Sequence, residues 1–149
     1  MALNREFVGR TYESSEPYEV SRVKIREFAA AIGESNPVCH DREAALAAGH
    51  RDLVAPPTFP IVFSLSSTSG ALADPGLGLD FSMVVHGEQR FEYRRPIYAG
   101  DELVCTSTVT EIRSVGRNEF LTLRSDISTT TGEPVCRTYN TIVERGGAA

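Results

Sequence analysis

The sequence lacks any apolar stretch that could span a membrane. In its 149 residues no hydrophobic run approaches the roughly 20 residues that a transmembrane helix needs. The first ten residues carry scattered charges around no apolar centre, so they do not form a secretory signal peptide. We therefore expect a cytoplasmic protein that has no membrane partner.

The sequence also has few cysteines and histidines, and it has no excess of positive charge. Cys39, Cys105 and Cys136 form an odd, widely spaced set without a Cys-x-x-Cys pair, which argues against a disulfide framework and a zinc site. With only three histidines besides, we expect no metal and no cofactor. The net charge of −5 leaves no dense basic patch for phosphates, so nucleic acid is not an expected partner.

The first predicted helix runs from Ser21 to about Ile32. The Ser21 hydroxyl can cap it, because it can accept an early backbone N–H. Apolar side chains recur at helical spacing and form one stripe: Ile25, Phe28, Ala29 and Ile32. Gly33 then ends the helix.

Two further helices are predicted after an Asn-Pro turn. Asp41 can cap a short one that Gly49 stops. A longer one is predicted from near Pro57 to about Leu72, because proline is favourable at the first helical position. Small side chains cover much of its surface, so a sheet can pack closely on it. We expect this helix to be central and buried.

The second half of the chain alternates apolar and polar residues, which is typical of half-buried strands. The pattern predicts four strands, at about 85–94, 102–112, 120–128 and 134–143. The tail, 144–149, is expected to fray. Helices followed by an antiparallel meander indicate an α+β fold, in which a sheet packs on one long helix. A hydrophobic content of 41% fits a single domain over residues 1–149.

One loop carries the side chains of an acid/base site. Residues 33–40 read Gly-Glu-Ser-Asn-Pro-Val-Cys-His and directly follow the first amphipathic helix. They place the carboxylate of Glu34, an Asn-Pro turn and the imidazole of His40 within one short segment. A carboxylate and a neutral histidine are the groups that a two-residue acid/base mechanism uses.

Three motifs give the chain a resemblance to a known family. Residues 33–40 resemble the hydratase motif Gly-Asp-x-Asn-Pro-(Leu/Ile/Val)-His, and Leu-Val-Ala-Pro-Pro-Thr-Phe at 53–59 resembles the start of that family's central helix. His-Gly-Glu-Gln-Arg-Phe-Glu-Tyr at 86–93, with Arg-Pro at 95–96 and Ala-Gly-Asp at 99–101, is the most specific match. The family is that of MaoC-like hot-dog proteins, in its N-terminal-domain (FAS1-like dehydratase) subgroup.

This resemblance implies a hot-dog fold and a 3-hydroxyacyl thioester substrate, carried by CoA or by an acyl-carrier protein. In the family, the Asp and His of the motif do the acid/base work, and the start of the central helix serves the thioester oxyanion. The corresponding catalytic candidates are Glu34 and His40. The corresponding substrate-binding candidates are Asn36, Pro37, Pro57, Thr58 and Phe59.

The chain departs from the motif twice. The Asp position holds Glu34, and the His position holds Cys39, with His40 one residue later. In an extended segment a one-residue slip turns a side chain to the opposite face. Two interpretations therefore stay open. In one of them, Glu34 and His40 form a shifted catalytic pair. In the other, Glu34 is a solvated acid at a helix end, and His40 is an exposed residue before the Asp41 cap.

Four functions follow from these alternatives. The first is an accessory dehydratase subunit that binds the acyl chain beside a partner with the intact motif, as in type II fatty-acid-synthase dehydratases. The second is a self-sufficient (R)-specific hydratase homodimer, and the third is a non-catalytic acyl-thioester binding protein. The fourth, a thioesterase, is disfavoured because the central helix has no separate acid. Since a hot-dog sheet usually pairs its edge with a second chain, we expect a homodimer or a heterodimer.

Overall fold

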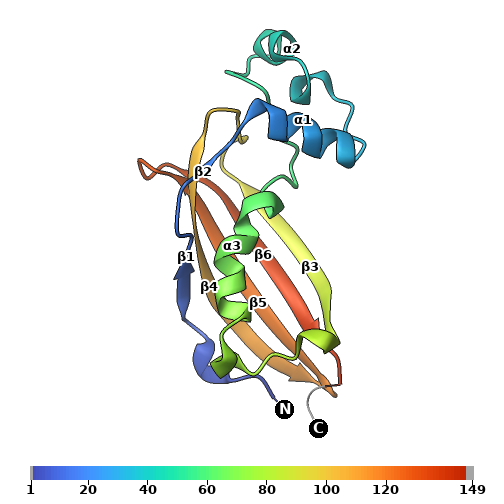
Figure 1. Cartoon of the computed structure of the whole chain (residues 1–149), viewed down its shortest axis with the longest axis vertical. Helices are drawn as coiled ribbons and strands as arrows, with labels where there is room; N and C mark the ends of the chain where they lie inside the picture. The colour runs from blue at the N-terminus through green and yellow to red at the C-terminus, as the bar shows by residue number, and fades with distance from the viewer. Residues whose placement is uncertain (1, 147–149) are drawn as a thin grey trace.

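The computed structural model describes residues 2–146 of the chain. Within them one six-stranded antiparallel sheet has the strand order β1-β4-β5-β6-β3, with β2 paired to β4. The strands are β1 Thr11–Glu13, β2 Tyr18–Glu19, β3 Val84–Tyr93, β4 Glu102–Val115, β5 Asn118–Thr129 and β6 Pro134–Glu144. The long strands β4, β5 and β6 form a meander, and β3 lies at one edge of the sheet (Figure 1).

Three α-helices accompany this sheet in the described residues. They are α1 Arg22–Ala31, α2 Arg42–Ala47 and α3 Ile61–Leu72. The helix α3 lies along the sheet and packs mainly on β1, β4 and β5, whereas α1 and α2 form a small lobe beyond one end of the sheet (Figure 1). This is the α+β hot-dog arrangement predicted from the sequence. No helix of residues 2–146 is long and apolar enough to cross a membrane.

The prediction for α1 is confirmed. The Ser21 hydroxyl accepts the backbone N–H of Lys24 at 3.1 Å, which satisfies one of the free donors at the start of the helix. Ile25 and Ala29 are fully buried, as the apolar stripe predicted. The last member of the stripe, Ile32, is the exception, because it follows the final helical turn and is half exposed.

The start of the central helix was predicted wrongly. The helix begins at Ile61, not near Pro57. A further proline, Pro60, has no N–H to donate, and it disfavours the helical conformation in the residue before it. Residues 57–60 therefore form turns, and the first i→i−4 bond runs from Ser64 N to Pro60 O, at 2.9 Å.

The small residues of α3 allow close packing, but on one face only. Ser67 is buried, and its hydroxyl lies 3.0 Å from the Cys105 sulfur and 2.8 Å from the Ser107 hydroxyl. Ser107 in turn bonds Ser125 at 2.7 Å, which continues the polar chain from β4 to β5. The opposite face, with Leu65 at 50% exposure, is uncovered. The expectation of a fully buried helix is therefore corrected.

Two short strands and the end of the last strand also differ from the prediction. β1 and β2 have three and two residues, too few to show a period of two, and they form by pairing with β4. Glu144, predicted to begin a frayed tail, is buried and ends β6. Residues 147–149 of that tail lie outside the described residues.

The core has two parts along α3. The part next to the helical lobe contains Ile25 and Ala29 of α1 together with Phe59 and Phe63. The part at the far end contains Leu121, Leu123 and Ile142 of the sheet and Phe7 from the N-terminal segment. The lobe is thus anchored to the end of the sheet by the first part of the core, which fixes one wall of the site described next.

Candidate functional site

A cavity of about 420 Å³ opens between the helical lobe and the end of β3. Its lining comes from the loop after α1, the segment before α3 and the end of β3: Glu34, Asn36, Val38, Cys39, Val54, Ala55, Pro56, Pro57, Tyr93, Arg94, Arg95 and Pro96. Half of these are apolar aliphatic or proline side chains. An apolar cavity of this size with a few polar groups is typical of a small-molecule site.

The loop after α1 is ordered by its own polar side chains. Gly33 has a φ of +73°, a left-handed conformation that glycine adopts without strain. The Glu34 carboxylate then accepts the backbone N–H of Asn36 at 2.9 Å, and the Asn36 side chain accepts that of Val38 at 3.2 Å. Pro37 begins a short 3-10 helix, Pro37–Cys39, so the predicted Asn-Pro turn is present.

The 3-10 geometry decides which side chains face the cavity. With three residues per turn, successive side chains point about 120° apart, so Cys39 and His40 cannot share a direction. Glu34 and Cys39 line the cavity, and His40 does not. The family's histidine position is thus filled by a thiol at the cavity wall.

His40 stabilises the loop from behind. Its ring Nε2 lies 2.6 Å from the backbone oxygen of Glu34, and its own backbone oxygen accepts Nε of Arg26 at 2.9 Å. Since a carbonyl oxygen can only accept, the imidazole donates through Nε2. The two candidate catalytic residues are brought together, but through the backbone of Glu34 and not through its carboxylate.

Cys39 is chemically quiet in this position. Burial raises the pKa of the Cys39 thiol, and the negative charge of Glu34 raises it further. A thiol with a raised pKa stays protonated at neutral pH, so it is neither a nucleophile nor a replacement for a neutral imidazole base. The cavity therefore holds one carboxylate and no free base among the described residues.

The candidate substrate-binding residues separate into two groups. Asn36 and Pro57 line the cavity, whereas Pro37 and Thr58 do not. Phe59 is fully buried and makes an edge-to-face contact with Phe28, with ring centroids 5.5 Å apart. It supports the cavity from the core side. Their roles in binding remain predictions.

The sequence assigned no role to Tyr93, which closes the cavity wall. Its hydroxyl donates to the backbone oxygen of Pro57 at 2.6 Å and so ties the end of β3 to the turn before α3. Burial raises the pKa of Tyr93 well above its usual range, and Cys136 beside it adds to the effect. Tyr93 belongs to the 86–93 motif, but the strand pattern alone does not show what its hydroxyl contacts.

Asp101 fixes the side chain of Arg95, which lines the cavity. Its carboxylate accepts from Arg95 at 2.9 and 3.1 Å, from Arg51 at 2.6 Å and from the backbone N–H of Tyr98 at 2.9 Å. Arg51 follows α2 and Arg95 follows β3, so this ion pair network joins the lobe to the sheet. The contacts with Tyr98 and Arg95 are local to the turn after β3, whereas the contact with Arg51 joins residues 50 positions apart, and no local pattern predicts it.

A comparison with family models decides the family. The model for the FAS1-like dehydratase domain region matches residues 6–138. The chain belongs to this family. The match runs from the N-terminal segment into β6 and so includes every element that lines the cavity.

Similar proteins and solved structures support this family assignment. A UPF0336 protein of Thermobifida fusca is 55% identical over 148 residues, covering 99% of this chain and 97% of its own. A chain of the HadBC complex, a 3R-hydroxyacyl-ACP dehydratase of Mycobacterium tuberculosis, matches with a TM-score of 0.83 and 26% identity. The match covers 92% of this chain and 96% of the HadBC chain. A MaoC-like dehydratase matches with a TM-score of 0.87 and 31% identity, over 93% of this chain but 42% of its own.

Membership of the dehydratase family supports a hydro-lyase role, and the geometry limits it. Glu34 can hold or activate a water at the cavity, because a carboxylate can accept a proton from it. Removing the α-proton of an acyl thioester needs a second group, which this cavity does not present. No group of three or more His, Cys, Asp or Glu side chains within residues 2–146 is placed to hold a metal.

Proposed function

We propose that this chain is a subunit of a (3R)-hydroxyacyl-thioester dehydratase or (R)-specific enoyl hydratase, and that it binds the acyl chain beside a catalytic MaoC-like partner. One observation carries the proposal: the cavity has Cys39 where the family motif has its histidine, while the His40 imidazole bonds to the backbone behind the loop. The carboxylate of the acid/base pair lines the cavity and the imidazole does not, as expected of an accessory chain.

The cavity suits the acyl end of a thioester. Its walls include Val38, Val54 and Pro96, and a lining of this kind favours an alkyl chain over a charged ligand. The thioester would arrive as acyl-CoA or on an acyl-carrier protein, and no cofactor is required for dehydration. We place the reaction in cytoplasmic fatty-acid synthesis, where the three buried, unpaired cysteines would remain reduced.

The free edge of the sheet supports a partner of the same fold. β3 is ten residues long and pairs only with β6 in the described residues, so one side of its backbone is open (Figure 1). Long open edges are unusual in monomers, because they invite pairing with another strand. The HadBC match is one chain of a complex, and the MaoC-like match occupies less than half of a longer chain.

The proposal is tested by the hydration of crotonyl-CoA, which is measured as the loss of absorbance of the enoyl thioester. The probe partner is a short MaoC-like chain of the same genome with an unbroken Gly-Asp-x-Asn-Pro-x-His motif. We expect no turnover by this chain alone and turnover by the co-purified pair. Because the His40 imidazole holds the loop but does not face the cavity, we expect His40→Ala to lower the turnover of the pair without abolishing it. A pair that is inactive on all chain lengths would exclude the proposal.

A self-sufficient homodimer is the second candidate, because Glu34 does line the cavity. In that case this chain alone would hydrate crotonyl-CoA, and His40→Ala and Glu34→Gln would each abolish turnover in a folded protein. The matched control is Glu43→Gln on α2, an exposed acid outside the cavity lining.

A further inference from the structure

A second cavity, of about 280 Å³, opens between α3 and the segment that contains β2. Its lining comes from that segment, from α3 and from β4: Ser14, Glu16, Pro17, Tyr18, Val62, Phe63, Ser66, Leu103 and Cys105. Glu16 is exposed, whereas Leu103 and Cys105 are buried, so this cavity runs inward from the surface. It reaches the part of the core next to the helical lobe, to which Leu103 and Cys105 belong.

Four aromatic rings, the aromatic cluster, fill that part of the core: Tyr18, Phe28, Phe59 and Phe63. Phe59 is at its centre. Its ring centroid lies 5.5 Å from that of Phe28, 6.3 Å from that of Phe63 and 6.4 Å from that of Tyr18. Tyr18 stacks on Phe63 at 4.9 Å, and these two rings line the second cavity. Aromatic pairs at such separations attract one another, so the cluster is a continuous barrier at the inner end of the second cavity.

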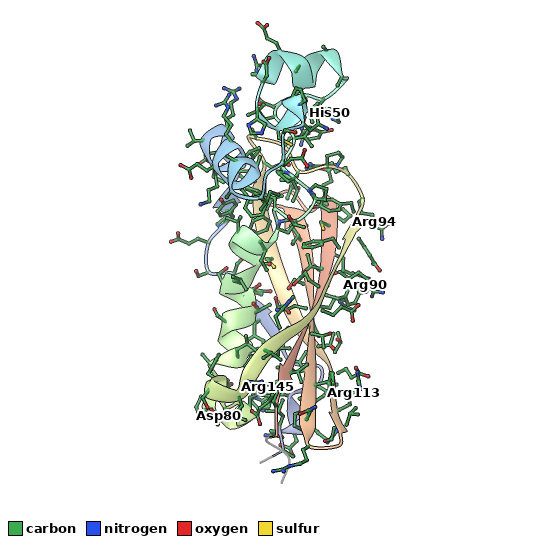
Figure 2. All side chains as sticks on the ribbon, turned by 90° about the vertical axis from the view of Figure 1, so that its right-hand side faces the viewer. His50, Asp80, Arg90, Arg94, Arg113 and Arg145 are labelled. Carbon is green, nitrogen blue, oxygen red and sulfur yellow. The ribbon has the colours of Figure 1, made fainter. Side chains whose placement is uncertain are left out.

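The cavity of the candidate site reaches the same aromatic cluster from the other side. Among its lining residues, Cys39 and Ala55 are buried, and both belong to the same part of the core as Phe59. Its charged rim includes Arg94, which is exposed and lies on the side of β3 away from α3 (Figure 2). An acyl thioester would therefore bind with its polar end toward Arg94 and its alkyl tail toward Phe59, because the tail favours the apolar end.

We propose that the aromatic cluster sets the upper limit of acyl-chain length, because Phe59 stops the tail before it reaches the second cavity. The inference rests on the proposed function, since it names the chain length that the same cavity accepts. A methylene takes up about as much space as a water molecule, roughly 30 Å³ in the liquid. The cavity of about 420 Å³ must also hold the thioester, so it admits a chain of about ten carbons.

The limit should be sharp, because the tail cannot displace Phe59 easily. Protein interiors are packed as densely as organic crystals, so a buried ring moves only if its neighbours move as well. The Phe59 ring has three aromatic neighbours, and its backbone N–H donates to the Pro56 oxygen at 2.9 Å in the turn before α3. Both the ring and the backbone of Phe59 are thus held in place.

The test measures the binding of saturated acyl-CoA esters with four to sixteen carbons to the isolated chain by titration calorimetry. Each methylene that enters an apolar cavity should tighten binding about fourfold. In the wild type this gain should end at about ten carbons. In Phe59→Ala it should continue for at least about four further carbons, because the space left by the ring joins the two cavities. A shorter continuation would overturn the inference.

Phe7→Ala is the matched control, because it removes an equally buried ring from the far part of the core. Its binding should stop tightening at the same chain length as in the wild type. A shift as large as that of Phe59→Ala would mean that a loosened core admits longer chains anywhere, and it would overturn the inference. If Phe59→Ala does not fold, Phe59→Val takes its place. This variant leaves less space, so we expect a continuation of about two carbons, and none would overturn the inference.

The outcomes separate this inference from the proposed function. If the pair with the motif-bearing chain hydrates crotonyl-CoA but Phe59→Ala does not extend the accepted chain length, the inference is overturned and the proposed function stands. If Phe59→Ala extends the accepted length but the pair has no turnover, the inference stands and the proposed function fails. Absence of acyl-CoA binding at every chain length would overturn the inference and the acyl-binding role together.

Discussion

Asp101→Asn should destabilise the fold beside the cavity, and the size of the loss follows from its burial. The Asp101 side chain is 6% exposed and binds Arg95, itself 17% exposed, as well as the more open Arg51. Removing one partner of a buried ion pair typically costs about 3–5 kcal/mol. The amide still accepts from Tyr98 N, and Arg95 keeps Glu133, so we expect about 2–3 kcal/mol.

A loss of this size is readily measured. For a chain of this length, 1 kcal/mol corresponds to about 3–4 °C in melting temperature, so Asp101→Asn should lower the melting temperature by roughly 6–12 °C in differential scanning calorimetry. The difference should persist in 1 M salt, because buried pairs are screened far less than exposed ones. Asparagine has nearly the volume of aspartate, which keeps the packing of the turn unchanged.

Asp126→Asn is the matched control. Asp126 also binds two arginines, Arg124 at 3.1 Å and Arg137 at 2.7 Å, but its side chain is 39% exposed. Exposed pairs contribute about 0–1 kcal/mol, so this variant should melt within about 4 °C of wild type. Equal losses for the two variants, or a loss below 2 °C for Asp101→Asn, would refute the reasoning that burial makes the Asp101 network important.

Three further predictions concern the cavity and its walls. Glu34→Asp with Cys39→His should give the isolated chain hydratase activity on crotonyl-CoA, about 10²-fold above the rate without enzyme, whereas Glu34→Asp with Cys39→Ser should not. Glu34→Gln should lower the pKa of Cys39 and speed its alkylation at pH 8, followed by peptide mass spectrometry, and an unchanged rate would contradict the assigned charge effect. Burial raises the pKa of the Cys136 thiol from 9.0 to about 11, so this thiol ionises at lower pH in the unfolded chain than in the folded one. The urea concentration at the midpoint of unfolding should therefore fall as the pH rises from 9 to 11, and it should fall less in Cys136→Ala.

Local patterns were sufficient for most of the fold. The Ser21 cap and the spacing of Ile25 and Ala29 predicted α1, because these interactions join residues within one helix. The alternation of apolar and polar residues predicted the strands of the meander, because it shows which face of each strand is buried. The pattern failed for the start of α3, where Pro60 removes a donor, and for β1, which exists only through its pairing with β4.

The candidate site was predicted in place but not in detail. Sequence spacing put Glu34 and the Asn-Pro turn in the right loop, and the departure at Cys39 was visible at once. Which neighbour faces the cavity depended on a 3-10 turn, which no periodicity indicates. Tyr93 and Asp101 act on residues 36 and up to 50 positions away, so their contacts follow from the packing of distant segments.

The contacts that hold the cavity open do not depend on the histidine of the family motif. The loop is held by the Asn36 side chain and the His40 imidazole, and the far wall by Tyr93 and Asp101. None of these contacts needs a histidine at the position of Cys39. A chain of this family can therefore lack the histidine of the motif without losing the shape of its cavity. Loss of the base with retention of the cavity is what selection for binding beside a catalytic partner would produce.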